Sequence, residues 1–328
     1  MQIASYLPEK CFENSAFADL GWSEEKIFAK TGILSRRIAS ETEFALDLAE
    51  KASLKLFKNF KIKKEEIDYL LYCTQSPDYL IPTNACILQD RLKLSESIGA
   101  LDFNLGCSGF VYGLSLAKGL LETGQAKSVL LVTAETYSKY IHPEDKSSRV
   151  IFGDGAAATL LTQEDARKLG PFVFGTQGAG AKNLCVKTGG LRYPRTALTA
   201  RSSKDRAGNA RSEDNLYMNG PEIFSFTLST VPGAVKELLR RSRLSAEEID
   251  HFVFHQANAY MLEALREKMG LPKEKFPIYL EKIGNTVSST IPILLEHMTA
   301  TGKFRTDQRL VLCAFGVGYS WIATLWNP

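Results

Sequence analysis

The sequence predicts an α/β protein built from two similar halves, and two patterns in the chain support this prediction. Short apolar runs, typical of strands buried on both faces, alternate with longer stretches of helical periodicity. In addition, residues 65–73 (EEIDYLLYC) resemble residues 247–255 (EEIDHFVFH) in the order and type of their side chains. We therefore expect parallel strands covered by helices, in halves of residues 1–165 and 166–328 related by a pseudo-twofold axis.

The composition narrows the functional classes. The chain has 328 residues, of which 45% are hydrophobic and 23% are charged, as in ordinary globular proteins. Its net charge of +3 provides no general electrostatic basis for binding nucleic acid. No apolar run approaches the roughly 18–20 residues of a membrane span, and the first residues lack the pattern of a secretory signal. We therefore expect a cytoplasmic protein with no nucleic-acid partner and no membrane span.

One cysteine differs from the others by its position. The six cysteines do not have the spacing of a zinc site or of a disulfide framework. Cys107 falls between an apolar run at residues 98–103 and a helical stretch at residues 111–121, with glycines on both sides. At the start of a helix, free N–H groups and the helix dipole favour a thiolate. We therefore expect a lowered pKa and a nucleophile; a buried structural thiol is the alternative.

Three further segments, all in the second half, also lie where an apolar run ends or a helical stretch begins. His255 directly follows the apolar run 249–254, at the carboxyl end of a predicted strand, where open α/β sheets bind ligands. The alternative role for this residue is a hydrogen-bonded core histidine. Asn285 lies in a Gly-Asn turn before a helical stretch, in the second half about where Cys107 stands in the first. Gly316-Val317-Gly318 forms a loop whose N–H groups could approach a ligand.

In this arrangement the chain resembles the β-ketoacyl-acyl-carrier-protein synthase III family of the thiolase-like superfamily. The resemblance covers essentially the whole chain, through motifs that stand in the family's order: Tyr6-Leu7-Pro8, Lys30-Thr31-Gly32-Ile33, Arg36-Arg37-Ile38, Cys107-Ser108-Gly109-Phe110, Phe152-Gly153-Asp154-Gly155-Ala156, His255-Gln256-Ala257-Asn258, Gly284-Asn285-Thr286 and Phe315-Gly316. The combination of Cys, His and Asn separates this branch from thiolases and from elongating synthases. The resemblance implies a five-layered α-β-α-β-α fold and a homodimer.

The resemblance also implies a reaction. Cys107 would take an acyl group from acyl-CoA or an acyl carrier protein, with the N–H groups of Cys107 and Val317 as the oxyanion hole. Malonyl-acyl carrier protein would then lose CO₂, and His255 and Asn285 would stabilise the enolate that attacks the acyl-Cys107. Such a decarboxylating condensation requires no metal and no other cofactor.

The residues implied to contact the substrates depart in part from the family pattern. The acyl channel would be lined by Phe224, Asn258, Phe315 and Ile81, and Ile81 replaces a Phe that closes the partner's pocket. We therefore expect a longer or branched acyl group.

The implied contacts to CoA or the carrier protein are Lys26, Arg36, Lys146 and Tyr260. Lys26 and Lys146 replace a Trp and an Arg that flank adenine, and Tyr260 replaces another Arg. Because Lys lacks the planar stacking of those groups, a carrier-protein donor becomes plausible.

Residues 187–211 hold seven basic side chains and one acidic side chain. This segment is either a solvated loop or a docking surface for an acidic partner.

Three other functions remain open at this point. A condensing enzyme of the chalcone-synthase or hydroxymethylglutaryl-CoA-synthase type also uses Cys, His and Asn. A papain-like protease has its His about 130–150 residues after its Cys, as here, although the α/β pattern and the duplication argue against it. An inactive subunit that binds acyl groups is disfavoured because all three residues are present.

Overall fold

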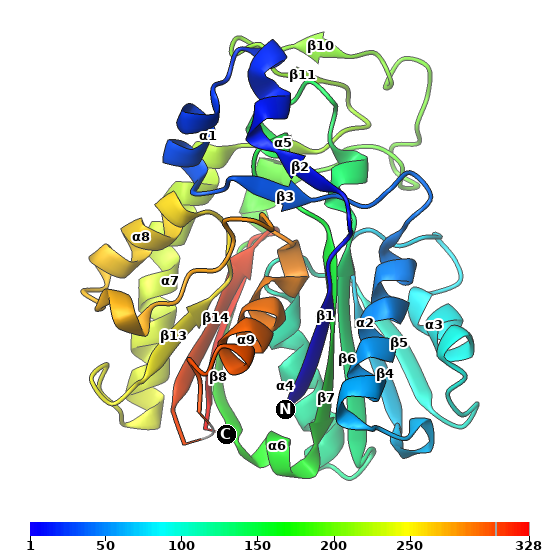
Figure 1. The fold of residues 1–328 in the computed structure, drawn as a ribbon, viewed down its shortest axis with the longest axis vertical. Coiled ribbons are helices and arrows are strands. Elements are labelled where there is room, and N and C mark those ends of the chain that lie inside the picture. Colours follow the sequence, from blue (N-terminus) through cyan, green and yellow to red (C-terminus); the bar gives the residue numbers. More distant parts are fainter. Residues whose placement is uncertain (306, 328) are drawn as a thin grey trace.

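The computed structural model describes residues 1–305 and 307–327, which form two open sheets with helices between and outside them (Figure 1). The first sheet has the strand order β1-β7-β6-β4-β5. Its strands are β1 (Gln2–Tyr6), β4 (Tyr69–Cys73), β5 (Gly99–Phe103), β6 (Ser128–Glu135) and β7 (Gly155–Thr162). Strand β4 pairs in parallel with both β5 and β6, whereas β7 runs antiparallel to β6 and β1.

The second sheet repeats this order with one strand fewer. Its order is β13-β14-β15-β8, with strands β8 (Leu169–Thr176), β13 (His251–Phe254), β14 (Leu310–Gly316) and β15 (Ser320–Trp326). Strands β8, β15, β14 and β13 thus correspond to β1, β7, β6 and β4. Within the described residues, β5 has no counterpart in this sheet. The two sheets therefore have the related topology that the internal similarity predicts.

The helices complete five layers, which confirms the predicted fold class. Helices α2 (Ala45–Phe60) and α3 (Asn84–Leu92) cover the outer face of the first sheet, and α7 (Gly220–Ser242) and α8 (Ala259–Lys268) cover that of the second. Helices α4 (Gly109–Glu122) and α9 (Thr290–Ala300) lie between the sheets (Figure 1). The proposed boundary at residue 165 falls within the short α6 (Gln163–Arg167), which links the two sheets.

The central layer brings the starts of its two helices together. Helix α4 contributes apolar side chains to a core shared with both sheets, so its sequence is apolar on most sides. At its first residue, a Cβ added to Gly109 would lie 2.2 Å from Sγ of Cys73 and 3.6 Å from Cβ of Ser288. Only glycine permits this approach, which places the start of α4 against the segment that leads into α9.

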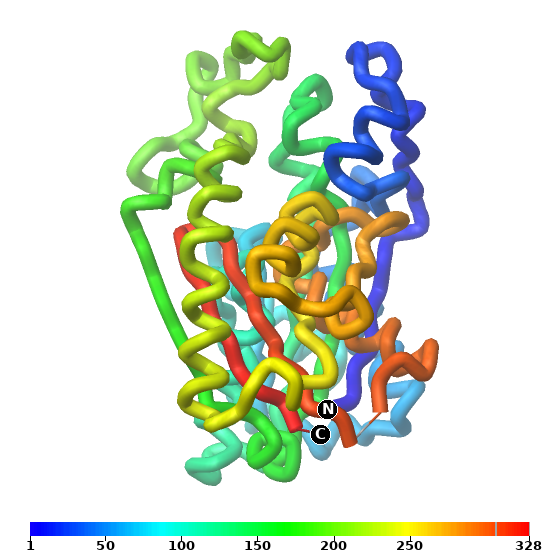
Figure 2. Tube along the Cα trace, turned by 90° about the vertical axis from the view of Figure 1, so that its left-hand side faces the viewer, coloured from blue at the N-terminus to red at the C-terminus, as the bar shows by residue number. Residues whose placement is uncertain are grey.

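Short elements extend beyond one end of the sheets. They are the ribbons β2 (Cys11–Glu13) with β3 (Ser35–Arg37), β9 (Leu184–Cys185) with β12 (Tyr217–Met218), and β10 (Ser203–Lys204) with β11 (Ala210–Arg211), together with α1 (Glu24–Thr31) and α5 (Lys146–Arg149). The 3₁₀ helices are η1 (Asn14–Leu20), η2 (Lys64–Glu66), η3 (Tyr137–Tyr140), η4 (Gly178–Asn183), η5 (Lys273–Lys275) and η6 (Val287–Ser289). Figure 2 shows the chain around residues 10–30, 140–150 and 190–215 rising at the top of the molecule.

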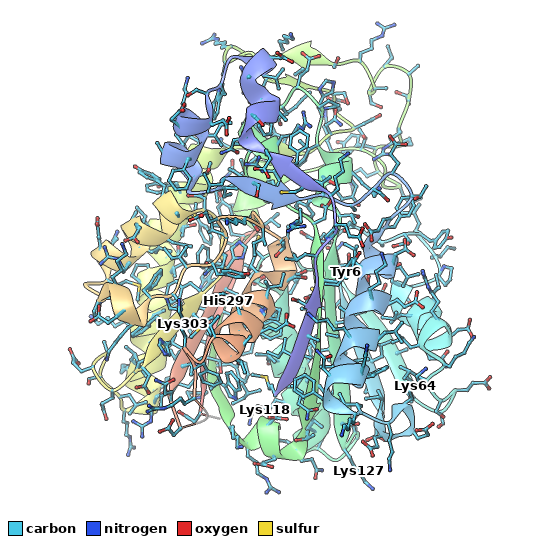
Figure 3. All side chains as sticks on the ribbon, in the orientation of Figure 1. Tyr6, Lys64, Lys118, Lys127, His297 and Lys303 are labelled. Atoms are coloured by element: carbon cyan, nitrogen blue, oxygen red, sulfur yellow. The ribbon has the colours of Figure 1, made fainter. Side chains whose placement is uncertain are left out.

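The opposite end of the molecule is marked by charged side chains. Lys118, on α4, and Lys127, just before β6, both lie at the lower end of the view in Figure 3. In the part of the chain that the structure describes, no helix has the length and apolar character of a membrane span.

Candidate active site

Cys107 lies in the turn between β5 and α4 and packs against the end of β14. A Cβ added to Gly316 would lie 2.6 Å from Cβ of Cys107 and 3.0 Å from its Sγ, so the thiol directly abuts this glycine. The neighbouring Ser108 shares a 2.7 Å hydrogen bond with the hydroxyl of Ser320 on β15. The turn of the first half is therefore fixed to the sheet of the second half, and Cys107 itself is only 6% exposed.

The charge state of Cys107 differs from the sequence prediction. Burial raises the pKa of its thiol to about 12, and the nearby Glu135 carboxyl adds to the increase, whereas the backbone N–H lowers it. The predicted lowering of this pKa is therefore wrong, because loss of hydration outweighs the helix start. In the resting protein the sulfur is a neutral thiol.

His255 follows the last residue of β13 and is held by three neighbouring groups. Its backbone N–H donates to the carbonyl of Cys313 at 2.9 Å, its Nδ1 lies 2.7 Å from Oγ1 of Thr290, and its ring meets that of Phe315 edge-on at 5.7 Å. Burial alone lowers the pKa of His255 to about 3, so the imidazole is neutral at pH 7. The hydrogen bond between Thr290 and Nδ1 therefore influences which ring nitrogen of His255 carries the proton.

Asn285 is oriented by the turn that it begins. Its Oδ1 accepts a 2.8 Å hydrogen bond from the N–H of Val287, while its backbone is bonded to Ile151 and Gly153. Val287 has φ 55°, a left-handed conformation that β-branched residues rarely adopt. This conformation allows its N–H to reach the carboxamide oxygen. Within the described residues, the Nδ2 group of Asn285 donates no hydrogen bond and is available to a ligand.

The structure brings the segments of these three residues together. Cys107 packs in one apolar cluster with Tyr137, Phe152, Leu184, Leu216 and Val287. Phe152 forms a bridge with Asn285, and Val287 is bonded to it, so Cys107 and the Asn285 turn share their neighbours. The consecutive residues Phe315 and Gly316 contact His255 and Cys107 respectively. The arrangement places a thiol near an imidazole and a carboxamide from the opposite half.

Two backbone N–H groups lie beside the thiol. In the described part of the molecule, neither the N–H of Cys107 nor that of Val317 donates to another residue, and the N–H of Cys107 contacts its own thiol. Val317 follows Gly316 and packs against the cluster that contains Cys107. Backbone N–H groups near a nucleophile that bind no other residue are suited to binding a developing oxyanion.

A large cavity extends outward from this cluster. It has a volume of about 840 Å³, and Tyr137, Leu184, Leu216 and Val317, which surround Cys107, contribute to its walls. Its outer wall includes Tyr79, Leu80 and Leu191, which are largely exposed. Ile81, on the same loop, is 85% exposed and does not line the cavity of its own chain.

A second pocket, of about 520 Å³, lies among the short elements above the sheets. Trp22, Lys30 and Ser147 line one side, and Asn209 and Arg211 line the other. Its walls also include Ile151 and Met218, which pack against the cluster around Cys107. This pocket therefore borders the cluster that contains Cys107.

The structure contradicts a substrate-contact role for Arg36. This side chain has no exposed surface, and its guanidinium donates to the carbonyls of Phe12 and Val150 and to Oδ1 of Asn14. It also lies 5.2 Å from the ring centre of Phe17. Arg36 therefore holds the N-terminal segment together and cannot reach a substrate.

The other predicted substrate contacts occupy varied positions. Lys26 lies 5.3 Å from the ring centre of Trp22, and Lys146 donates to the carbonyl of Leu20 at 3.1 Å. Neither side chain lines the second pocket, which Trp22 and Lys30 line. Phe224 and the exposed Tyr260 stack at 5.5 Å.

Asn258 and Phe315 are engaged within the fold. Asn258 caps α8 through a 2.8 Å hydrogen bond from the N–H of Met261. Phe315 is buried beside His255.

Ion pairs reduce the positive charge of residues 187–211. Lys187 pairs with Glu213, Lys204 with Glu144 at 3.0 Å, and Arg211 with Asp205 and with Asp145 at 3.7 Å. In the described chain, the basic side chains of this segment that make no ion pair are Arg192, Arg195, Arg201 and Arg206. The segment is ordered by the hairpin of β10 and β11, and its usable charge is smaller than its sequence indicates.

Sequence reasoning missed two buried polar residues near the site. Thr290 contacts His255, and Glu135 ends β6 with its carboxyl buried. A signal for Glu135 was present, because a lone acidic residue follows the apolar run 129–134 at the carboxyl end of a strand. The role of Thr290 has no such signal, because a hydroxyl residue at a helix start is common.

Comparisons with known proteins identify the family of the chain. Family models match residues 101–178, as 3-oxoacyl-[acyl-carrier-protein (ACP)] synthase III, and residues 239–327, as the C-terminal part of that enzyme. The β-ketoacyl-[acyl-carrier-protein] synthase III of Caldanaerobacter subterraneus subsp. tengcongensis is 35% identical over 324 residues, which cover 98% of this chain and 95% of the relative. A crystal structure of a 3-oxoacyl-(acyl-carrier-protein) synthase III matches with TM-score 0.97 and 53% identity, covering 99% of this chain and 98% of that chain. The Thermus thermophilus enzyme matches with TM-score 0.87 and 34% identity, covering 99% and 98%. The chain belongs to the β-ketoacyl-[acyl-carrier-protein] synthase III family.

Proposed function

We propose that the protein condenses an acyl thioester with malonyl-acyl carrier protein and releases a β-ketoacyl product, CO₂ and the donor's thiol. The observation that carries this proposal is the position of Cys107 against Gly316, next to Val317, whose N–H donates to no group in the described residues. The family membership of the whole chain supports the same reaction.

In the first step, Sγ of Cys107 attacks the thioester carbonyl. The carbonyl oxygen becomes an oxyanion, which the N–H groups of Cys107 and Val317 stabilise. The donor's sulfur then leaves with the proton that the thiol gives up, and an acyl-Cys107 thioester remains. Because the resting thiol is neutral, the proton has to move during this step rather than before it.

In the second step, the malonyl thioester loses CO₂ and its carbonyl oxygen gains negative charge as an enolate. Nδ2 of Asn285 and Nε2 of His255 donate hydrogen bonds to that oxygen, and the carbanion attacks the carbonyl carbon of acyl-Cys107. The bond from that carbon to Sγ breaks as the new carbon–carbon bond forms, and the released thiolate takes up a proton from water to restore the thiol. Donation from Nε2 requires that His255 carries its proton there. In this tautomer Nδ1 is an acceptor, and the hydroxyl hydrogen of Thr290 points to Nδ1 at 2.7 Å rather than to the carbonyl of Val287 at 3.2 Å. The neutral state of His255 is compatible with this role.

The acyl group occupies the cavity that begins at Val317 and Tyr137 in this proposal. Its volume of about 840 Å³ supports donors longer than acetyl. Two exposed apolar features support a homodimer. Strand β5 is an edge strand on which Leu101 is 44% exposed, and the exposed Ile81 lies on a loop that would reach the partner's cavity. Equal rates with acetyl and octanoyl donors would contradict the proposed preference, and a single monomeric species in sedimentation would contradict the dimer.

The second pocket supports binding of the carrier that brings the donor acyl group. Trp22 and Lys30 line it in place of the predicted Lys26 and Lys146, and Arg211 lies on its far wall. An aromatic ring and two cations suit the phosphate-bearing end of CoA or of a carrier's pantetheine arm. The reaction proposed here uses no cofactor and takes place in the cytoplasm.

The direct test is mass spectrometry of the intact protein after incubation with acyl-CoAs and acyl carrier proteins of several chain lengths. We expect an adduct of the acyl mass on Cys107, and CO₂ release when malonyl-acyl carrier protein is added. Cys107→Ser should lose the thioester adduct, whereas Cys86→Ser, at an exposed thiol outside the site, should keep it. An adduct that persists in Cys107→Ser would overturn the proposal.

A further inference from the structure

Glu135, the last residue of β6, is a fully buried carboxyl that neither step of the proposed reaction uses. Its Oε2 accepts hydrogen bonds from Oγ of Ser76 at 2.9 Å and from the N–H of Gln75 at 3.1 Å. Its Oε1 accepts one from Oγ of Ser288 at 2.9 Å. Gln75 and Ser76 belong to the first half and Ser288 to the second. One carboxyl therefore connects the two halves beside the site.

The contact with the first half leads to the Cys107 turn. The side-chain oxygen of Gln75 lies so close to Gly106 that a Cβ there would come within 2.4 Å of it. The amide of Gln75 donates to Oδ1 of Asn104 at 3.0 Å, so the side chain is held in place. The backbone before Cys107 therefore rests on a residue whose own N–H is bonded to Glu135.

The contact with the second half leads to Asn285. Ser288 directly follows Val287, whose left-handed backbone presents its N–H to the Asn285 carboxamide. A β-branched residue persists in this conformation only where its surroundings impose it. The hydrogen bond from Ser288 to Glu135 is one such constraint, because it anchors the residue after Val287 to the first half.

The hydrogen bonds around Glu135 extend beyond its direct partners. Burial raises the pKa of Glu135 to about 8, so the group is largely protonated at pH 7. The Ser288 hydroxyl also lies against the thiol of Cys73, which donates to the carbonyl of Leu105 at 3.0 Å. Glu135, Ser288 and Cys73 thus belong to one group of hydrogen-bonded side chains, which ends at the carbonyl of Leu105, two residues before Cys107. The titratable groups that face Glu135 are Tyr72, Cys73, Cys107, Tyr137 and Tyr140.

We infer that Glu135 is a positioning residue, whose hydrogen bonds to Gln75, Ser76 and Ser288 fix the Asn285 turn of one half relative to the Cys107 turn of the other. This inference rests on the proposed function. Its consequence is selective: decarboxylation, which depends on Asn285, relies on the link through Ser288 more strongly than acylation does. Cys107 keeps its contacts with Gly316 and, through Ser108, with Ser320 when this link is lost.

The test measures the two steps separately in Glu135→Ala, Glu135→Gln, Ser288→Ala and the double variant Glu135→Ala/Ser288→Ala. Acylation is followed by intact mass, and CO₂ release from malonyl-acyl carrier protein reports decarboxylation. We expect Ser288→Ala and Glu135→Ala to slow decarboxylation about ten- to a hundredfold, as small displacements of catalytic groups do, with a much smaller effect on acylation. The double variant should be no slower than Glu135→Ala. Glu135→Gln should keep both rates at pH 7, because its amide supplies a donor and an acceptor.

Ser289→Ala is the matched control. It removes a buried hydroxyl from the same turn, but that hydroxyl bonds to the carbonyls of Thr133 and Gly155 and, within the described residues, makes no hydrogen bond to Glu135. When Ser289→Ala is combined with Glu135→Ala, the fold-losses in rate of the two single variants should multiply to within about twofold, as they do for independent sites. If Glu135→Ala does not fold, the two serine variants provide the test. The inference then requires that Ser288→Ala slows decarboxylation more than acylation and that Ser289→Ala does not.

Two results would overturn the inference. One is that the losses of Glu135→Ala and Ser288→Ala multiply as independent effects do. The other is that Ser288→Ala slows both steps equally. A wild-type protein that forms no acyl-Cys107 or releases no CO₂ contradicts the proposed function instead, so the two failures are distinguishable.

Discussion

Gly316 provides the sharpest test of the position of Cys107. A methyl group at this residue would lie 2.6 Å from Cβ of Cys107 and 3.0 Å from its Sγ. Carbon atoms in contact are about 3.5 Å or more apart, so Gly316→Ala has to move one partner by about 0.9 Å. The end of β14 is paired with β15 through Gly316 and Ser320, which leaves the Cys107 turn as the part that yields. A shift of this size at a reacting group slows the chemistry by about a hundredfold.

The assay is the rate at which Cys107 becomes acylated, followed by intact mass under single-turnover conditions. Gly119→Ala is the control, because it adds a methyl group in open space on α4, the helix that starts beside Cys107. We expect Gly119→Ala to acylate at the wild-type rate, and Gly316→Ala to acylate about a hundredfold more slowly. The melting temperature separates this effect from unfolding. A Gly316→Ala variant that acylates at the wild-type rate would show that Cys107 does not abut β14 as described.

Three further predictions concern buried polar groups. Because the pKa of Glu135 rises from 4.5 to about 8 on folding, the folded protein holds a proton that the unfolded chain releases, and stability falls as the pH rises. Between pH 5 and 8 this residue alone should lower the free energy of unfolding by about 3 to 4 kcal/mol, and Glu135→Gln should show no such loss in urea unfolding; identical pH profiles would refute this. Thr290→Val should slow decarboxylation about tenfold by removing the partner of Nδ1 of His255, and Thr290→Ser should restore it; a normal rate in the Val variant would contradict this role. Arg36→Gln should lose about 3 kcal/mol of stability through its hydrogen bonds to Phe12, Asn14 and Val150. The KM for acyl donors should stay the same, and a raised KM without a change in melting temperature would restore Arg36 as a substrate contact.

The fold could be predicted from the sequence because its signals are local and repeated. Apolar runs and helical stretches recur in the same order in both halves, and the similarity of residues 65–73 to 247–255 relates two strands that prove to be β4 and β13. Strand ends and helix starts are also local signals, so the turns of Cys107 and Asn285 could be placed. The missing counterpart of β5 could not be predicted, since strand pairing depends on distant partners.

The errors concern quantities that depend on the tertiary environment. The helix start next to Cys107 is readable in the sequence, but the burial that raises its pKa is not. Arg36 stands in a motif beside Arg37, and nothing in the motif shows that the first side chain points inward. The charge of residues 187–211 was overestimated because its ion-pair partners Glu144 and Glu213 lie outside the segment.

The contact between the starts of the two central helices has an electrostatic consequence. Gly109, the first residue of α4, approaches Ser288, which leads into α9, so two positive ends of helix dipoles face the same small volume. Like ends repel, and within this volume the resting thiol and imidazole carry no formal charge that would offset the repulsion. An anion formed or bound there gains from both helices at once, whereas a cation is opposed by both. Small carboxylates should therefore compete with malonyl substrates, and amines of the same size should not.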